Sequence, residues 1–159
     1  MTKARVIFMC GPAGSGKSTL ARQLEAEGMV RLSFDTEAWK RGIRSAPFPA
    51  DVRSSIEEEL LTRLRSYVES GASVVLDFSF WSRKMRDDYR RFVNSLGVDP
   101  ETIYLATPRE VVLKRIRERS GSDSDEFVLP EALAAEYFDN FEVPTPDEGP
   151  LKVITDGVA

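Results

Sequence analysis

The sequence predicts an α/β fold built on a mainly parallel β-sheet with helices covering both faces. Short apolar runs typical of strands alternate with helical patterns about five times along the chain. In addition, the first of these runs leads through a glycine-rich loop into a helix. Parallel strands need crossover connections, which are right-handed in almost all proteins. Ligands bind such sheets beyond the carboxyl ends of the strands, so a functional site is expected there.

The expected strands are short, rich in β-branched and apolar residues, and bounded by polar or glycine-containing segments. They cover residues 4–10, 29–34, 72–78, 102–106 and 151–155. The runs at 4–10 and 72–78 are the most strongly apolar, so we expect them to lie side by side in the centre of the sheet.

The expected helices are marked by start and stop signals. In chain order these signals are the stop at Gly28, the cap Asp35, the capping box of Ser55 and Glu58, the stop at Gly71, the cap Ser82, the stop at Gly97, the start at Thr107, Pro108 and Glu110, and the start at Pro130. The helix over 36–44 is short, whereas the next one carries an apolar residue at every fourth position from 52 to 68. The last two helices run from 107 to about 119 and from 130 to about 141.

The composition limits the classes of protein that the chain can form. With 159 residues, 42% of them hydrophobic, one domain over 1–159 is expected. The net charge of −4 gives no overall attraction for a polyanion, so a dedicated nucleic-acid binder is not favoured. No apolar run approaches the ~20 residues of a membrane helix, and we expect a soluble, cytoplasmic protein.

Cysteine and histidine usage excludes several kinds of site. Cys10 is the single cysteine, so an internal disulfide and a thiolate zinc site are excluded, and a packing role in the first strand is expected. The chain has no histidine, which excludes histidine-based triads and histidine metal sites. A general base must therefore be a carboxylate or a less usual group.

The loop Gly11–Ser18 reads G-x-x-x-x-G-K-S, the full phosphate-binding loop (P-loop) pattern, between a strand and a helix. Backbone N–H groups of such a loop bind phosphate oxygens, and its glycines keep side chains out of the way. Lys17 is expected to contact the β- and γ-phosphates, and Ser18 to ligate Mg²⁺. ATP is expected by elimination, because the guanine-specifying N-K-x-D tetrapeptide is absent. The residues expected to bind the nucleotide are Gly11, Ala13, Gly14, Ser15, Gly16, Lys17, Ser18 and Thr19.

Two carboxylates follow or end predicted strands and should lie near this loop. Asp77 ends an apolar strand, as does the aspartate that holds Mg²⁺ through water in P-loop proteins. Its alternative role is to cap a turn. Asp35 can act as the general base that accepts a proton from an acceptor hydroxyl, or it can simply cap the helix that begins at Thr36.

Arg115 and Arg119 lie four positions apart on the helix that precedes an acidic, aperiodic segment. On one helix face they would repel each other unless an anion lay between them. We expect them to clamp phosphates from a mobile lid at about 115–130. The alternative is an ordinary solvated helix face.

Aromatic residues also follow predicted strand ends and are candidates to line an acceptor pocket. They are Trp39, Phe48, Phe80 and Trp81. Packing in the core is the alternative role for each of them.

Together these residues resemble the small P-loop kinase group that includes polynucleotide 5′-hydroxyl kinases, zeta-toxin kinases and chloramphenicol phosphotransferase. The resemblance rests on Gly11–Ser18, on Asp35 after the second strand, and on Arg115–Arg119 followed by 128–130 and a helix. It implies a three-layer P-loop NTPase fold, the strand order 2-3-1-4-5, and phosphoryl transfer from ATP to a hydroxyl. The polynucleotide kinases tend to carry an arginine three residues after the aspartate, where this chain has Ala38.

The expected activity is therefore that of an ATP- and Mg²⁺-dependent phosphotransferase, with Lys17, Asp35, Arg115 and Arg119 as catalytic residues and Ser18 and Asp77 at the metal. The acceptor is expected to be a small or nucleotide-like molecule; a nucleic acid is not favoured, and the acceptor's identity and the oligomeric state stay open. The alternatives are a nucleotide-binding switch or ATPase that acts through a partner, and a polynucleotide 5′-hydroxyl kinase.

Overall fold

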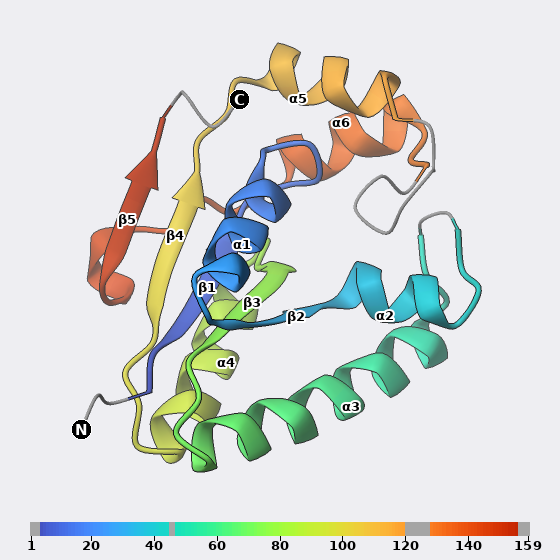
Figure 1. Ribbon diagram of the computed structural model, residues 1–159. Helices are drawn as coiled ribbons and strands as arrows, with labels where there is room; N and C mark the ends of the chain where they lie inside the picture. The colour runs from blue at the N-terminus through green and yellow to red at the C-terminus, as the bar shows by residue number, and fades with distance from the viewer. Residues whose placement is uncertain (1–3, 45–46, 120–127, 156–159) are drawn as a thin grey trace.

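A computed structural model describes residues 4–44, 47–119 and 128–155 of the chain. They form a five-stranded sheet with the order β2-β3-β1-β4-β5, in which every neighbouring pair is parallel (Figure 1). The strands are β1 (Val6–Cys10), β2 (Val30–Ser33), β3 (Val74–Ser79), β4 (Glu101–Leu105) and β5 (Leu151–Ile154). The predicted α/β class, parallel sheet and strand order are confirmed.

Helices cover both faces of this sheet. They are α1 (Lys17–Ala26), α2 (Phe34–Lys40), α3 (Ala50–Glu69), α4 (Arg83–Ser95), α5 (Arg109–Arg117) and α6 (Glu131–Asp139), with a short 3₁₀ helix, η1 (Pro146–Glu148). Helix α1 packs on one face, and α3 and α4 pack on the other, which produces three layers (Figure 1). Over the described ranges, no helix combines the length and apolar character needed to cross a bilayer.

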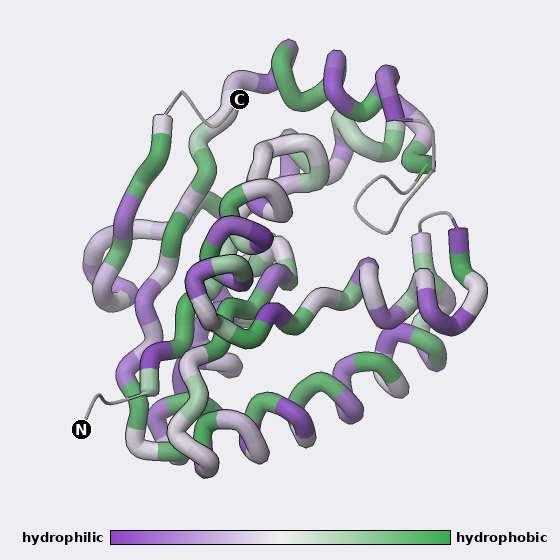
Figure 2. Tube along the Cα trace, in the orientation of Figure 1, coloured by the Kyte–Doolittle hydropathy of each residue, from purple (hydrophilic) through white to green (hydrophobic). Residues whose placement is uncertain are grey.

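The larger part of the core lies between the sheet and α3 with α4. Apolar residues recur at regular intervals along α3 (Figure 2). Those buried in this core are Ile56, Leu60, Leu64 and Val68. Because both faces of the sheet are covered, β1 is buried along its whole length, which explains its continuous apolar sequence. Burial raises the pKa of the Cys10 thiol to about 12, so this residue is a packing residue, as predicted.

Helices α5 and α6 form a smaller core beside the glycine loop. Its buried members are Val112, Leu113, Ile116, Leu129 and Ala134. Ala13 of the loop packs against this cluster. The glycine loop therefore lies between the main sheet and a second hydrophobic cluster.

Several predicted helix signals are confirmed. The Ser82 hydroxyl caps α4 by accepting a hydrogen bond from the Met85 N–H at 3.1 Å. Gly28, Gly71 and Gly97 follow α1, α3 and α4 with φ angles of 112°, 86° and 85°. This left-handed conformation ends a helix and favours glycine.

Two predicted helix boundaries are wrong. Helix α3 begins at Ala50, after a proline, so Ser55 and Glu58 lie inside the helix and form no capping box. Pro49 occupies the N-cap position, without a side-chain capping bond, in place of the predicted signal. Helix α2 ends at Lys40, short of the predicted end at residue 44, because Gly42 adopts a φ of 88°.

The prediction that Arg115 and Arg119 share one helix face is also wrong. Helix α5 ends at Arg117, and the Arg119 N–H donates to the Ile116 carbonyl at 3.2 Å in a tight closing turn. Arg119 therefore lies beyond the helix. Of the lid predicted at 115–130, residues 120–127 lie outside the described residues.

A buried ion pair ties α4 to η1. The side chains of Arg86 and Glu148 are 1% and 3% exposed, and two hydrogen bonds of 2.7 and 3.2 Å join them. Arg86 donates a further bond of 2.7 Å to the Phe80 carbonyl. Burial raises the pKa of Glu148, but Arg86 and the Thr145 backbone lower it by more, so this pKa lies below its ordinary value. Multiple hydrogen bonds of this kind offset the cost of burying two charges.

Replacement of Arg86 by methionine should therefore destabilise the fold, because the buried Glu148 would lose both of its hydrogen bonds to Arg86 and keep only the more distant Arg90, at 3.9 Å. We expect Arg86→Met to lower the free energy of unfolding in urea by about 3–5 kcal/mol. The double variant Arg86→Met/Glu148→Leu should lose less than the single variant. A double variant at least as unstable as Arg86→Met would contradict this account.

Candidate functional site

The glycine loop connects β1 to α1 and places a helix N-terminus at the carboxyl edge of the sheet. Gly14 and Gly16 adopt φ angles of 85° and 98°, and Gly16 is the N-cap residue of α1. A glycine cap brings no side chain to the first backbone N–H groups of the helix, and no acidic residue lies in its first turn. Such a terminus attracts anions.

A side chain would be crowded at two positions of the loop. A Cβ atom on Gly11 would lie 2.6 Å from the Ser15 Oγ atom, and one on Gly14 would lie 3.0 Å from the Val112 carbonyl oxygen. The Ser15 Oγ atom is itself buried, with no hydrogen-bond partner among the described residues. A buried hydroxyl of this kind is costly unless a ligand satisfies it.

The segment around α5 holds the loop from the other side. The Thr107 hydroxyl donates to the Ser15 carbonyl at 2.7 Å, and the Arg115 guanidinium donates to the Gly14 carbonyl at 3.2 Å. The prediction that Thr107 caps α5 is therefore wrong, since Pro108 occupies the N-cap position and Thr107 is used in this tertiary contact. Arg115 therefore contacts the glycine loop directly.

A buried carboxylate, Asp77, lies next to the loop. Its Oδ2 atom accepts hydrogen bonds from the Ser18 hydroxyl at 2.8 Å and from the Arg31 guanidinium at 2.7 Å. Its Oδ1 atom lies 3.2 Å from the Lys17 ammonium, but the direction is not that of a hydrogen bond. Burial raises the pKa of Asp77, whereas Lys17 and Arg31 lower it by more, so the pKa lies below its ordinary value and the group is ionised.

Sequence reasoning missed Arg31. This residue lies on β2, its side chain is 8% exposed, and it reaches Asp77 on the neighbouring strand. In the register of the two parallel strands Ser33 is opposite Asp77, so Arg31 lies two positions away on the same face. The sequence indicated only that a buried carboxylate such as Asp77 needs cations nearby. Which cation it meets depends on the register of β2 and β3, which is a tertiary property.

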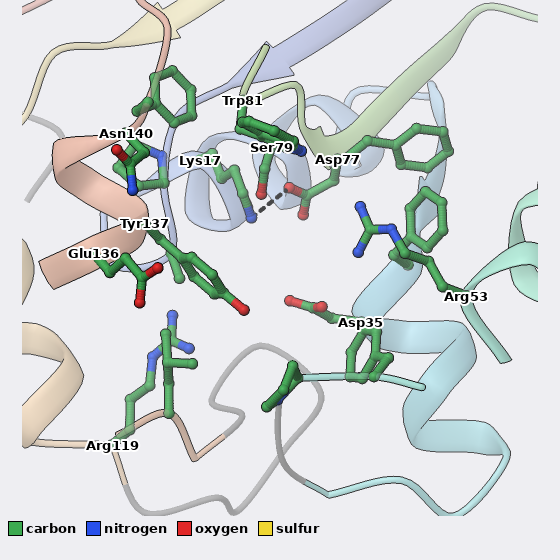
Figure 3. A pocket seen from close by; sticks show the side chains of 18 residues that line it. Lys17, Asp35, Arg53, Asp77, Ser79, Trp81, Arg119, Glu136, Tyr137 and Asn140 are labelled. Carbon is green, nitrogen blue, oxygen red and sulfur yellow. Dashed lines mark ion pairs between the residues drawn. The ribbon is translucent and has the colours of Figure 1, made fainter. Parts of the chain in front are cut away.

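A cavity of about 530 Å³ opens beside the loop and brings most of the predicted site residues together (Figure 3). It lies between the loop, the end of β3, α2 and α6. Its lining residues are Pro12, Ala13, Lys17, Phe34, Asp35, Pro47, Phe48, Arg53, Asp77, Phe78, Ser79, Trp81, Arg119, Leu129, Glu136, Tyr137, Asn140 and Phe141. Lys17, Asp35, Asp77 and Arg119 thus share one space, although they come from different parts of the chain.

Asp35 does not cap α2, which corrects one of its two predicted roles. The Ser33 hydroxyl is the cap and accepts a hydrogen bond from the Thr36 N–H at 3.2 Å. Asp35 lies in the first turn of α2, and its carboxylate points into the cavity (Figure 3).

The four aromatic candidates divide into two groups. Phe48 and Trp81 line the cavity, as one of the two predicted roles requires. Phe80 is fully buried and stacks on Phe8, with ring centroids 4.3 Å apart. Trp39 packs on the main core, with the Arg44 guanidinium 3.8 Å from its ring centroid.

The fold and the site together define a P-loop nucleotide-binding protein, because a strand, a glycine loop and a helix present lysine and serine beside a buried aspartate. The known proteins that the chain resembles agree with this class. The model of the AAA_33 family, described as an AAA domain, matches residues 6–144. The chain belongs to this family, and the predicted resemblance to P-loop kinases is confirmed.

Several of the similar proteins are kinases. The shikimate kinase of Buchnera aphidicola subsp. Acyrthosiphon pisum (strain APS) is 33% identical over 144 residues, which cover 86% of this chain and 80% of that protein. A sugar kinase from Janibacter sp. HTCC2649 has a similar structure, with a TM-score of 0.66, 23% identity, and coverage of 96% of this chain and 85% of that one. For the APS kinase of Mycobacterium tuberculosis, in complex with AMPPNP and APS, these values are 0.65, 16%, 99% and 92%. The protein is a P-loop kinase.

The close packing of Gly14 predicts a selective loss of nucleotide binding. We expect Gly14→Ala to weaken MgATP binding at least about ten-fold in calorimetry, because the methyl group displaces the loop from the Val112 carbonyl and the residue must keep a positive φ. Gly42→Ala is the matched control, since Gly42 has a φ of 88° and open space around it. Equal loss of affinity in both variants would refute the local explanation.

The position of Arg31 predicts a combined effect on stability and binding. In Arg31→Met, Asp77 keeps Lys17 and Ser18 but loses one of its cations, so the free energy of unfolding should fall by roughly 1.5–3 kcal/mol. Binding of ATP should also weaken. If Lys17 then moved from Asp77 to a phosphate, the charge of the buried Asp77 carboxylate would be poorly compensated. Urea denaturation and calorimetry on the same preparation measure both effects, and unchanged ATP affinity would show that Arg31 is only a structural residue.

Proposed function

We propose that the protein transfers the γ-phosphate of ATP to a hydroxyl group of a small-molecule acceptor bound in the cavity. The observation that carries this proposal is that the Lys17 ammonium and the Asp35 carboxylate line the same cavity. Lys17 belongs to the loop that would hold the phosphates, and Asp35 approaches from α2. A phosphate and an acceptor hydroxyl can thus meet between them.

The loop residues fit a nucleoside triphosphate and its magnesium ion. Ser15 offers a buried hydroxyl without a partner among the described residues, and the N-terminus of α1 is free of acidic side chains in its first turn. Ser18 and Asp77 are the residues that would hold Mg²⁺, and the Asp77 Oδ1 atom accepts no hydrogen bond from the described residues. When bound, Mg²⁺ neutralises charge on the β- and γ-phosphate oxygens.

The proposed reaction assigns a role to each charged group. Asp35 accepts the proton of the acceptor hydroxyl while the oxygen of that hydroxyl forms a bond to the γ-phosphorus. The bond from the γ-phosphorus to the β,γ-bridging oxygen breaks, and ADP leaves with that oxygen. Lys17 moves from Asp77 to the phosphates and stabilises the charge on them. Asp77 stays paired with Arg31 during this movement. Arg119 and Arg115 would add positive charge, the first from the cavity wall and the second from the loop contact.

Two observations favour a small acceptor over a nucleic-acid end. Position 38, where the resemblance to polynucleotide kinases would place an arginine, is a fully buried alanine in the main core. The chain also has a net charge of −4, which gives no general attraction for a polyanion.

Asp35→Asn tests this proposal with label transfer from γ-labelled ATP to a panel of hydroxyl compounds. We expect turnover to fall by about 10²–10⁴-fold, because the amide cannot accept the proton, while MgATP affinity in calorimetry stays near that of the wild type. The control is Asp51→Asn, the same change at an exposed position in the first turn of α3. Steady ATP hydrolysis with no labelled acceptor in the wild type would refute the kinase reaction and favour an ATPase.

A further inference from the structure

The cavity wall is rich in aromatic residues. Its aromatic members come from β3, α2, α6 and the loops near them, and they are Phe34, Phe48, Phe78, Trp81, Tyr137 and Phe141. Four of these pack at least partly on the main core, whereas Trp81 and Tyr137 are 48% and 43% exposed. Large aromatic rings left open to solvent inside a cavity indicate a surface that a ligand covers.

The backbone that presents Trp81 is strained. Ser79 and Phe80 are consecutive non-glycine residues with φ angles of 69° and 53°, and they are the only such residues in the described ranges. Two left-handed residues in a row are unfavourable and persist only where surrounding contacts impose them. Strain of this kind is concentrated at ligand-binding and catalytic sites.

Hydrogen bonds from three separate segments impose this conformation. The Ser79 carbonyl accepts from the Gly11 N–H at 2.9 Å, and the Trp81 carbonyl accepts from the Glu142 N–H at 2.8 Å. The Phe80 carbonyl between them accepts from the buried Arg86 guanidinium at 2.7 Å. With the Phe80 ring fixed in the core, the turn directs the Trp81 side chain into the cavity (Figure 3).

Tyr137 reaches the same cavity from α6. This helix is held on α5 by Ala134 in the small core and by an ion pair of 2.9 Å between Arg109 and Asp139. The Tyr137 side chain extends from it toward Asp35 (Figure 3). Both exposed rings therefore line the cavity that also holds the carboxylate that would receive the acceptor's proton.

The charges of the wall argue for a neutral acceptor. The lining includes Lys17, Arg119 and Asp77, which the proposed reaction assigns to the phosphates and the metal, and Asp35, the proposed base. The remaining charged residues of the lining, Arg53 and Glu136, cancel formally, so they give no net preference for an anion or a cation. Apart from the rings, its uncharged polar side chains are Ser79 and Asn140. That is a small set for a polyol, because each buried hydroxyl of a polyol needs a partner.

We infer that the acceptor is a neutral alcohol with a flat aromatic or heteroaromatic ring. Trp81 and Tyr137 bind this ring, and the acceptor's hydroxyl lies beside Asp35. This inference rests on the proposed function. The ring chemistry is shared by free aryl alcohols and by nucleosides. Trp81 and Tyr137 are thus specificity-determining residues for the acceptor and have no contact with the nucleotide loop in this scheme.

The first experiment compares label transfer from γ-labelled ATP to three acceptor sets: aryl alkanols, nucleosides and ring-free polyols. We expect ring-containing acceptors to be preferred, and Trp81→Ala to lower their kcat/KM by about ten-fold or more through KM, the size of effect that a stacking ring contributes. Trp81→Phe should restore most of the loss, and MgATP affinity should not change. Tyr67→Ala is the control, because Tyr67 is an exposed aromatic residue on α3 outside the cavity wall. The arm with the higher kcat/KM, aryl alkanol or nucleoside, identifies the source of the ring.

The second experiment measures binding without turnover. The chain has two tryptophans, so in a Trp39→Phe background the tryptophan emission comes from Trp81 alone. Ring-containing alcohols should change this emission in a saturable way, and ring-free polyols should not. A change of this kind with no label transfer to any alcohol would support the ring site and refute the kinase reaction. Efficient transfer to polyols that Trp81→Ala leaves unchanged would refute the ring site and leave the kinase reaction intact. No change in emission with any ring-containing alcohol would also overturn the inference.

Discussion

The compensation of one buried charge, that of Asp77, is the constraint on which the site depends. Its carboxylate is 1% exposed and lies among Lys17, Ser18 and Arg31, which come from the glycine loop with α1 and from β2. A buried carboxylate without such partners would be protonated or would destabilise the fold. The same cluster therefore fixes β2 against β3, holds the start of α1, and keeps the loop lysine in place until a phosphate competes for it.

The second constraint is that the loop is packed from both sides. The main sheet supports it through β1, and the cluster on α5 and α6 contacts it through Ala13 and through the bonds to Ser15 and Gly14. Its backbone geometry is thus set before any ligand arrives. Pre-organised N–H groups need no rearrangement when a phosphate binds, which favours both affinity and catalysis.

The parts of this molecule that local patterns encode could be predicted from the sequence. The strands follow from apolar runs, the glycine loop from its motif, and the helix stops at Gly71 and Gly97 from the preference of glycine for positive φ angles. The strand order followed from the family resemblance. The parts that depend on tertiary register could not. Arg31 meets Asp77 only because β2 and β3 pair as they do, and Thr107 uses its hydroxyl on the loop although its sequence context is that of a helix cap. The roles of Asp35, Arg115 and Arg119 stay predictions, now with defined positions.

The turn at Ser79–Trp81 joins the loop at Gly11 to the segment after α6 at Glu142 through main-chain bonds. A connector of this kind couples ligands at its two ends only if each ligand shifts its conformation. Thermodynamic linkage then requires symmetry: whatever factor the nucleotide imposes on the dissociation constant of the second ligand, that ligand imposes on the nucleotide. Any synergism or antagonism in ternary-complex formation that passes through this turn would thus be an equilibrium property, whichever ligand arrives first.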